Sequence, residues 1–263
     1  MRPAAIGVLK MMSFAKGARV AAMLAVIALV VSACETRSIS NSGYPGDRWG
    51  YYGASNPLYQ GELSDLDVLG IDPDRQIAAQ EIVQALDGYR RPVIARGSNV
   101  MVVQSGAMIP DEPMMREMNR YFAATPVSGV PVRRPQPGGG SDKPGAYAAA
   151  LRLTGAQGGQ ETIFCYWGVL ETAQINHVTK AVSWVPIVGA GVPDQTQRMR
   201  IRLKAAVIDV RTGRWSIFTP ESFEDESLSA SFTRRTSDQE QVALLKEKGY
   251  AAAVSEFVKV YTR

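Results

Sequence analysis

Histidine is nearly absent from this chain of 263 residues, and its scarcity narrows the possible chemistry. His177 is the one histidine, which excludes a histidine metal cluster and obliges any Ser-His-Asp site to use it. No Gly-x-Ser-x-Gly motif accompanies it, and we interpret it as a solvated loop residue. The glycine stretches Gly138–Gly140 and Gly189–Gly191 lack the spacing of a phosphate loop. The sequence therefore predicts a protein that is not an enzyme, with no catalytic residues, metal site or cofactor.

Acidic residues are missing from the first 34 positions, which do contain basic ones. An apolar run of twelve residues follows from Val20 to Val31. This run is shorter than the roughly 20 residues that span a bilayer. It ends in Ser32-Ala33-Cys34. A basic segment, a short apolar segment and small residues in this order predict an export signal over residues 1–33.

The end of this signal, Val31-Ser32-Ala33-Cys34, resembles the bacterial lipobox. The resemblance implies lipidation of the Cys34 thiol with a diacylglyceryl group and cleavage before Cys34. Two or more acyl chains anchor a protein firmly, whereas one chain binds a membrane only marginally. The residue after the cysteine is Glu35 rather than aspartate, which by similarity to enterobacterial lipoproteins favours the periplasmic face of the outer membrane. An ordinary signal peptide that ends near a cysteine is the alternative.

The net charge of +4 comes from the signal rather than from the mature protein. Loss of residues 1–33 removes four of the 29 Lys+Arg and none of the 25 Asp+Glu, which leaves a formally neutral chain. Charge therefore gives no support for a nucleic-acid partner. With Cys34 consumed by lipid, Cys165 is left alone in an apolar run. We expect it to be a buried thiol, so the fold must be stable without a disulfide.

Composition divides the mature chain into three parts. Residues 34–60, rich in Ser, Gly, Asn and Pro, are expected to form the lipidated cysteine and a flexible tether. Residues 61–90 are expected to form a peripheral helical segment, whose helix runs from Asp72 to Asp87. Residues 91–263 are expected to form one globular domain.

Within this domain, periodicity predicts strands and helices in alternation, followed by hairpins and a terminal helix. The expected strands are 99–104, 127–132, 163–172, 178–188, 198–210 and 214–219, and the expected helices are 111–122, 147–153 and 237–262. A capping box at Ser237–Glu240 starts the last helix. The predicted fold is α+β, a mixed and mostly antiparallel sheet with helices packed on it, including a long C-terminal helix.

This order of elements resembles the small domain at the N-terminus of the Tol translocation protein. The curli secretion channel, an exopolysaccharide-export ring protein and activators of penicillin-binding proteins have similar domains. The resemblance depends on Val100–Val103, Tyr147–Gly168, the hairpin Ala205–Trp215 and the C-terminal helix. The long insertion between Ala173 and Gln197 departs from the pattern. The resemblance implies an outer-membrane lipoprotein fold more than a specific function.

Two features are candidates for partner binding. Strand alternation places four cations on one face of the predicted strand 198–210, namely Arg198, Arg200, Arg202 and Lys204. Such a stripe suits an anionic glycan, lipid or protein, although acids on a neighbouring strand would make it an ordinary solvated face. Trp184, in an apolar stretch of the insertion, is either core or a second partner surface.

Together these features predict a lipid-anchored, periplasm-facing envelope protein that acts as a non-catalytic accessory or scaffold subunit of an export or cell-wall complex. Its expected partners are the membrane, through the lipid, and another envelope protein; a homo-oligomer is left open. A periplasmic hydrolase is one alternative, and a cleft with paired carboxylates would favour it. An oligomeric ring component of a secretion channel is another, and it predicts a discrete oligomer in detergent.

Overall fold

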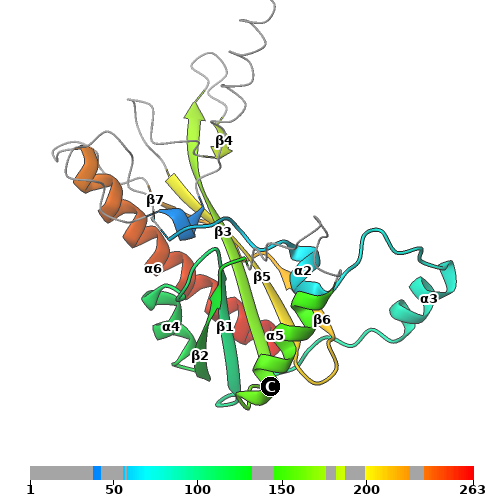
Figure 1. The fold of residues 1–263 in the computed structure, drawn as a ribbon. Coiled ribbons are helices and arrows are strands. Elements are labelled where there is room, and N and C mark those ends of the chain that lie inside the picture. Colours follow the sequence, from blue (N-terminus) through cyan, green and yellow to red (C-terminus); the bar gives the residue numbers. More distant parts are fainter. Residues whose placement is uncertain are drawn as a thin grey trace, which may run out of the picture.

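The computed structural model describes most of the predicted globular domain (Figure 1). The described residues are 38–42, 56, 58–131, 145–175, 182–186, 199–225 and 234–263. The signal, Cys34, His177 and Arg198 lie outside them, as do the side chains of Trp184 and of the expected capping box Ser237–Glu240. The predictions for the signal, Cys34, His177, Arg198 and Trp184 therefore remain predictions. The predicted start of the last helix at Ser237 is wrong, because this helix begins at Arg234 and Ser237 lies within it.

A seven-stranded mixed sheet forms the centre of the molecule. Its strands are β1 (Asn99–Ser105), β2 (Ala123–Gly129), β3 (Thr162–Ile175), β4 (Val182–Pro186), β5 (Met199–Asp209), β6 (Trp215–Phe218) and β7 (Phe223–Asp225). Five of them follow the order β2-β1-β3-β5-β6, while β4 pairs with β3 and β7 pairs with β5. β1 is parallel to β2 and β3, and the other pairs are antiparallel. This confirms the predicted α+β class.

Helices lie on both faces of the sheet (Figure 1). They are the 3-10 helix η1 (Ile39–Asn41) and the α-helices α2 (Asp65–Leu69), α3 (Ala79–Asp87), α4 (Glu112–Met118), α5 (Ala146–Gln157) and α6 (Arg234–Tyr261). The alternation along β1 explains the layers. Val100 and Val102 join the hydrophobic core under α4 and α6, whereas Met101 and Val103 join a second core under α2 and α5. Each face of the sheet is thereby buried.

The central strand β3 contributes large side chains to both cores. Phe164 contacts Phe257 of α6 with ring centroids 4.8 Å apart, and Tyr166 meets Tyr250 edge-on at 5.7 Å. Cys165 points to the opposite face, where it is fully buried and unpaired. Burial raises the pKa of its thiol, which therefore stays protonated. The prediction that Cys165 is a buried thiol is thus confirmed.

The predicted hairpin turn between β5 and β6 is confirmed. The carboxylate of Asp209 accepts hydrogen bonds from the backbone N–H of Thr212 at 2.6 Å and from its hydroxyl at 2.7 Å. Gly213 has a φ of 71°, in the left-handed region that glycine occupies without steric cost. The residues of the turn thus favour this connection, and Arg152 of α5 also donates to the carbonyls of Val210 and Arg211, each at 3.0 Å.

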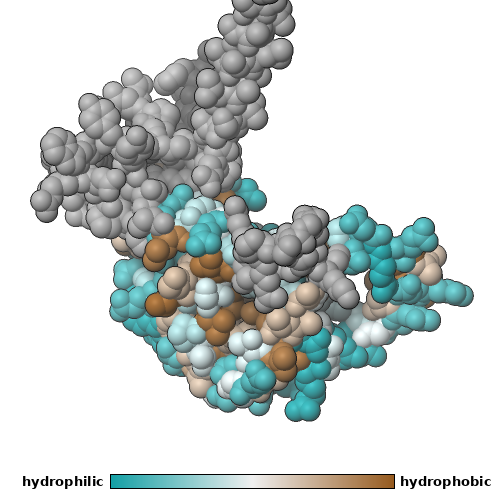
Figure 2. All heavy atoms as spheres, in the orientation of Figure 1, coloured by the Kyte–Doolittle hydropathy of each residue, from teal (hydrophilic) through white to brown (hydrophobic). Residues whose placement is uncertain are grey.

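Helix α3 differs from its prediction in length and in packing. The sequence predicts a helix from Asp72 to Asp87, but α3 begins at Ala79. The Asp72 carboxylate instead accepts a hydrogen bond from the backbone N–H of Asp74, closing a local turn. The apolar stripe of α3 is exposed, with exposed fractions of 56% for Ile82, 55% for Val83 and 71% for Leu86. Figures 1 and 2 show this segment projecting from the body.

Candidate functional site: a docked N-terminal segment and its pocket

The segment Ser38–Ser42, which begins four positions after Cys34, is built into the protein core. Ile39 is 1% exposed and belongs to the core under α6, and Ser38 forms an antiparallel bridge with Val169 of β3. A flexible tether was expected over residues 34–60, and this expectation is wrong for these five residues. Polar composition suggested solvent exposure, but the serine hydroxyls are paired inside the protein. We call Ser38–Ser42 the docked segment.

Gly168 on β3 provides the space in which Ile39 lies. A Cβ atom at this position would be 2.7 Å from a methyl of Leu203 and 2.9 Å from side-chain atoms of Ile39. Real Cβ atoms essentially never approach other atoms so closely. The absence of a side chain at Gly168 therefore lets the docked segment pack directly on the sheet.

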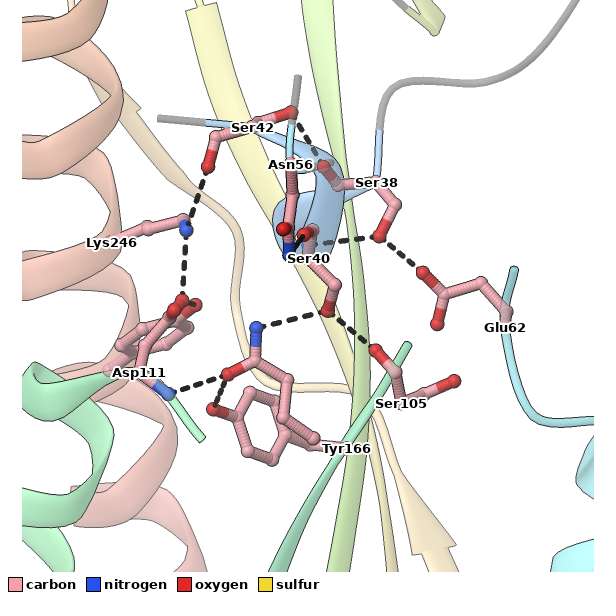
Figure 3. A network of polar contacts seen from close by, with 11 residues as sticks. Ser38, Ser40, Ser42, Asn56, Glu62, Ser105, Asp111, Tyr166 and Lys246 are labelled. Carbon is pink, nitrogen blue, oxygen red and sulfur yellow. Dashed lines mark hydrogen bonds and ion pairs between the residues drawn. The ribbon is translucent and has the colours of Figure 1, made fainter. Parts of the chain in front are cut away.

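A buried polar network holds Ser40 in the middle of the docked segment (Figure 3). The Ser40 hydroxyl donates to the Ser105 carbonyl at 2.5 Å and accepts from the Gln104 amide at 3.0 Å. The Gln104 oxygen accepts in turn from the Tyr166 hydroxyl at 2.5 Å and from the backbone N–H of Asp111 at 2.7 Å. Burial raises the pKa of Tyr166 well above its usual value, so its phenol remains a donor. These partners offset the cost of burying an amide and two hydroxyls.

Lys246 of α6 binds the end of the docked segment (Figure 3). Its ammonium donates to the Ser42 carbonyl at 3.1 Å and forms an ion pair with Asp111 at 2.9 Å. The Tyr250 hydroxyl also donates to Asp111, at 2.6 Å. One buried cation therefore joins the C-terminal helix to the docked segment.

Asn56 contacts the docked segment through both its backbone and its side chain. Its N–H donates to the Asn41 side-chain oxygen at 3.0 Å, and its amide donates to the Ser40 carbonyl at 3.1 Å. Asn56 thus attaches the docked segment in addition to β1, β3 and α6.

Glu62 binds the start of the docked segment. Its Oε1 accepts hydrogen bonds from the hydroxyls of Ser38 and Tyr59, the latter at 3.3 Å. Glu62 as a whole residue is exposed, yet desolvation raises the pKa of its carboxyl. Hydrogen bonds from Ser105, Ser38 and Tyr59 lower this pKa, but by less than desolvation raises it. The docked segment thus begins at a carboxyl whose charge the protein partly disfavours.

A pocket of about 490 Å³ lies against Ser38. Trp167 provides apolar surface beside the lining residues Gly168 and Leu203, and Glu62 and Lys204 contribute polar groups. Trp167 is fixed by a 2.8 Å hydrogen bond from its indole N–H to the Leu63 carbonyl. The ammonium of Lys204 lies 4.9 Å from the centre of the Trp167 ring. The pocket therefore combines an apolar wall with a polar rim.

The basic stripe predicted on β5 is paired with acids in the described residues. Arg200 and Arg202 bind the two oxygens of Glu171 on β3, at 2.6 and 2.9 Å, and Lys204 binds Asp65 of α2 at 2.6 Å. Glu171 is only 3% exposed. The sequence had allowed acidic neighbours on an adjacent strand as the alternative to a partner surface, and Glu171 is such a neighbour. Partner binding by these cations remains a prediction.

Sequence reasoning missed the network around the docked segment. Its signals were single polar residues in apolar surroundings: Gln104 at the end of the apolar strand β1, and Lys246 beside Val242 and Leu245 in α6. Each is a buried polar side chain that requires a partner. Nothing in the sequence identified Ser40 as that partner.

The described residues contain neither a membrane-spanning helix nor a cluster of metal ligands. Across the helices of the described ranges, none combines the length and hydropathy needed to cross a bilayer. Within those same ranges, no three His, Cys, Asp or Glu side chains converge as metal ligands would.

Comparison with known proteins identifies a family. The model of a family described as YafT bacterial lipoprotein matches residues 64–260, more than half of the chain. No curated protein sequence matches. Among solved structures, a PelC dodecamer from Paraburkholderia phytofirmans is similar at 13% identity, covering 62% of this chain and 95% of that chain, with a TM-score of 0.24. That TM-score is too low for the likeness to bear on fold or function.

Proposed function

We propose a specific role for this membrane-anchored lipoprotein, which belongs to the YafT bacterial lipoprotein family. The protein is a non-catalytic accessory or scaffold subunit of an export or cell-wall complex. Lipid on Cys34 attaches it to the periplasmic face of the outer membrane. It acts there by binding another envelope protein.

The short link between Cys34 and the docked segment supports a positioning role for the anchor. Four residues extend at most about 14 Å along the backbone, so a lipid on Cys34 would hold the Cα of Ser38 within that distance of the Cα of Cys34. Because Ser38–Ser42 is buried, the globular body has little freedom to move away from the bilayer. A lipid at Cys34 would therefore fix the height of the body above the membrane and turn the side that carries Ser38 towards it.

The exposed apolar face of α3 is the observation that carries the proposed protein contact. A helix of nine residues is marginal in water without tertiary packing, yet Ile82, Val83 and Leu86 are all more than half exposed. Contiguous apolar surface of this kind marks interaction sites. The range Ala79–Asp87 contains no Lys or Arg, which a helix lying on an anionic bilayer would favour. An apolar groove on a protein suits this face better than a lipid surface.

The resemblance of the element order to domains of the Tol, curli-secretion and penicillin-binding-protein-activator lipoproteins supports the envelope setting. It does not identify the partner, because one fold hosts many functions. The partner must be found through the surface itself.

Photocrosslinking in the native host tests the proposal. A photoreactive amino acid at position 86 should give an adduct with a discrete envelope protein, and Ile82→Glu in the same chain should abolish it. Leu153 on α5 is the matched control, since it is also an apolar helical residue and is 58% exposed. Equal labelling from positions 86 and 153, or no protein adduct from position 86, would contradict the proposal. An adduct with a second copy of this chain would favour a ring component instead.

A further inference from the structure

We propose that the pocket beside Ser38 binds an acyl chain of the lipid on Cys34, so that the protein shields part of its own anchor from water. This inference rests on the proposed lipidation of Cys34. It adds a second role for the docked segment, which then delivers the lipid to a site on the body.

Proximity is the first argument. Ser38 is part of the pocket wall, and Cys34 lies four positions before it. A fully extended link places the Cα of Cys34 no farther than about 14 Å from the Cα of Ser38. An acyl chain attached there is present at the pocket at high effective concentration, because the short link makes its binding intramolecular. Free amphiphiles would have to compete with an acyl chain that is covalently attached to the protein.

The shape and wall of the pocket suit an acyl chain. Its volume of about 490 Å³ is within the range of roughly 300–1,000 Å³ that ligand sites have. Trp167, Gly168, Val169 and Leu203 line it. Removing methylenes from water onto such a surface is favourable in proportion to the area buried. This wall can therefore hold a hydrocarbon chain.

The rim suits the glyceryl ester rather than a phosphate. Arg202 is paired with Glu171, and Lys204 reaches both carboxylate oxygens of Asp65, at 2.7 and 2.6 Å. These ion pairs neutralise the positive charge that would attract a phosphate. The hydroxyl of Thr219 on the rim can donate to a neutral ester carbonyl. The chemistry thus favours a diacylglyceryl group over an anionic headgroup.

The state of Glu62 agrees with this assignment. Its carboxyl forms part of the pocket wall, and desolvation raises its pKa despite the hydroxyls of Ser38 and Tyr59 that donate to it. A wall that disfavours charge is compatible with a neutral ester and a hydrocarbon chain.

Photolabelling through the lipid itself tests the proposal. The host is fed a fatty acid with a diazirine near the end of its chain, and the mature lipoprotein is purified, placed in phosphatidylethanolamine vesicles and irradiated. We expect intramolecular adducts on peptides that contain Trp167–Val169 and Arg202–Lys204. Two variants that narrow the pocket, Val169→Phe in its wall and Thr219→Phe at its rim, should lower this labelling at least about tenfold. Val127→Phe, at a half-buried position on β2, is the matched control and should leave it unchanged.

The outcomes separate this inference from the proposed anchor. An intact mass that shows lipid on Cys34, together with adducts on vesicle lipids alone, would overturn the pocket assignment and leave the anchor standing. Pocket labelling from a photoreactive vesicle lipid, with none from the protein's own chain, would also overturn it. An unmodified Cys34 would overturn the anchor and the pocket assignment together. Circular dichroism shows whether each of the two narrowing variants folds. If one does not fold, the labelling of the other variant tests the proposal.

Discussion

Among single residues, Lys246 is the one whose charge connects the two ends of the described chain. Its side chain is almost completely buried between Asp111 and the Ser42 carbonyl. Lys246→Met keeps the apolar stem but leaves a buried carboxylate without its cation, which should destabilise the protein by about 3 kcal/mol. Urea unfolding measures this. Lys259→Met, at an exposed position on the same helix, should change stability by less than about 0.5 kcal/mol. Equal effects of the two variants would contradict the role given to Lys246.

Gly168 offers a second test, because its missing side chain makes room for Ile39. Gly168→Ala should cost about 1–3 kcal/mol through overpacking against Ile39 and Leu203. In combination with Ile39→Ala, which empties the same space, the two changes should cost less than the sum of the single changes. Thermal unfolding of the three variants completes the cycle. Strict additivity would mean that the two residues do not compete for this space.

Glu62 makes stability depend on pH with a defined sign. Because its pKa is raised in the folded state, the folded protein binds the proton more tightly than the unfolded chain. The resulting stabilisation is complete below the ordinary pKa of about 4.5 and is lost as pH rises through the folded value. Glu62→Gln should therefore gain stability relative to the wild type as pH rises above about 4.5. Urea unfolding across this range measures the gain; a difference that is constant with pH would contradict the assignment, and Glu81→Gln serves as the exposed control.

At the level of elements, hydrophobic alternation predicted the strands well because each side of the sheet is buried locally. β1, β3 and β5 lie close to their predicted positions, and the turn at Asp209–Gly213 follows from its own residues. The docked segment was missed because its partners are distant in sequence. Ser40 bonds to Gln104, which is 64 positions away, and no local pattern records such a pair. Periodicity predicted the apolar stripe of α3 but could not show that nothing in the described chain covers it.

The exposed stripe of α3 permits a prediction that separates binding from folding. Leu86→Glu should leave the free energy of unfolding within about 0.5 kcal/mol of the wild type, since Leu86 is 71% exposed. The same variant should lose the proposed envelope partner in affinity capture after crosslinking. Leu151→Glu, at a buried position of α5, should instead destabilise the protein strongly. Retention of the partner by a folded Leu86→Glu protein would remove α3 from the proposed interface.

The whole molecule is a lipoprotein of the YafT family in which the residues Ser38–Ser42 are packed into the globular body. With the proposed lipid on Cys34, the lipid, the docked segment, the pocket and α6 would form one continuous arrangement. Buried contacts of the docked segment would then set the position of the body at the membrane. Cys34 is the residue on which this arrangement depends.

The intact mass of the mature protein, isolated from the membranes of its native host, tests this claim most directly. We expect a polypeptide that begins at Cys34 and carries a diacylglyceryl group on its sulfur. We also expect Cys34→Ser to release the protein or to leave its precursor uncut. A chain that retains residues 1–33, or an unmodified sulfur at Cys34, would contradict this claim.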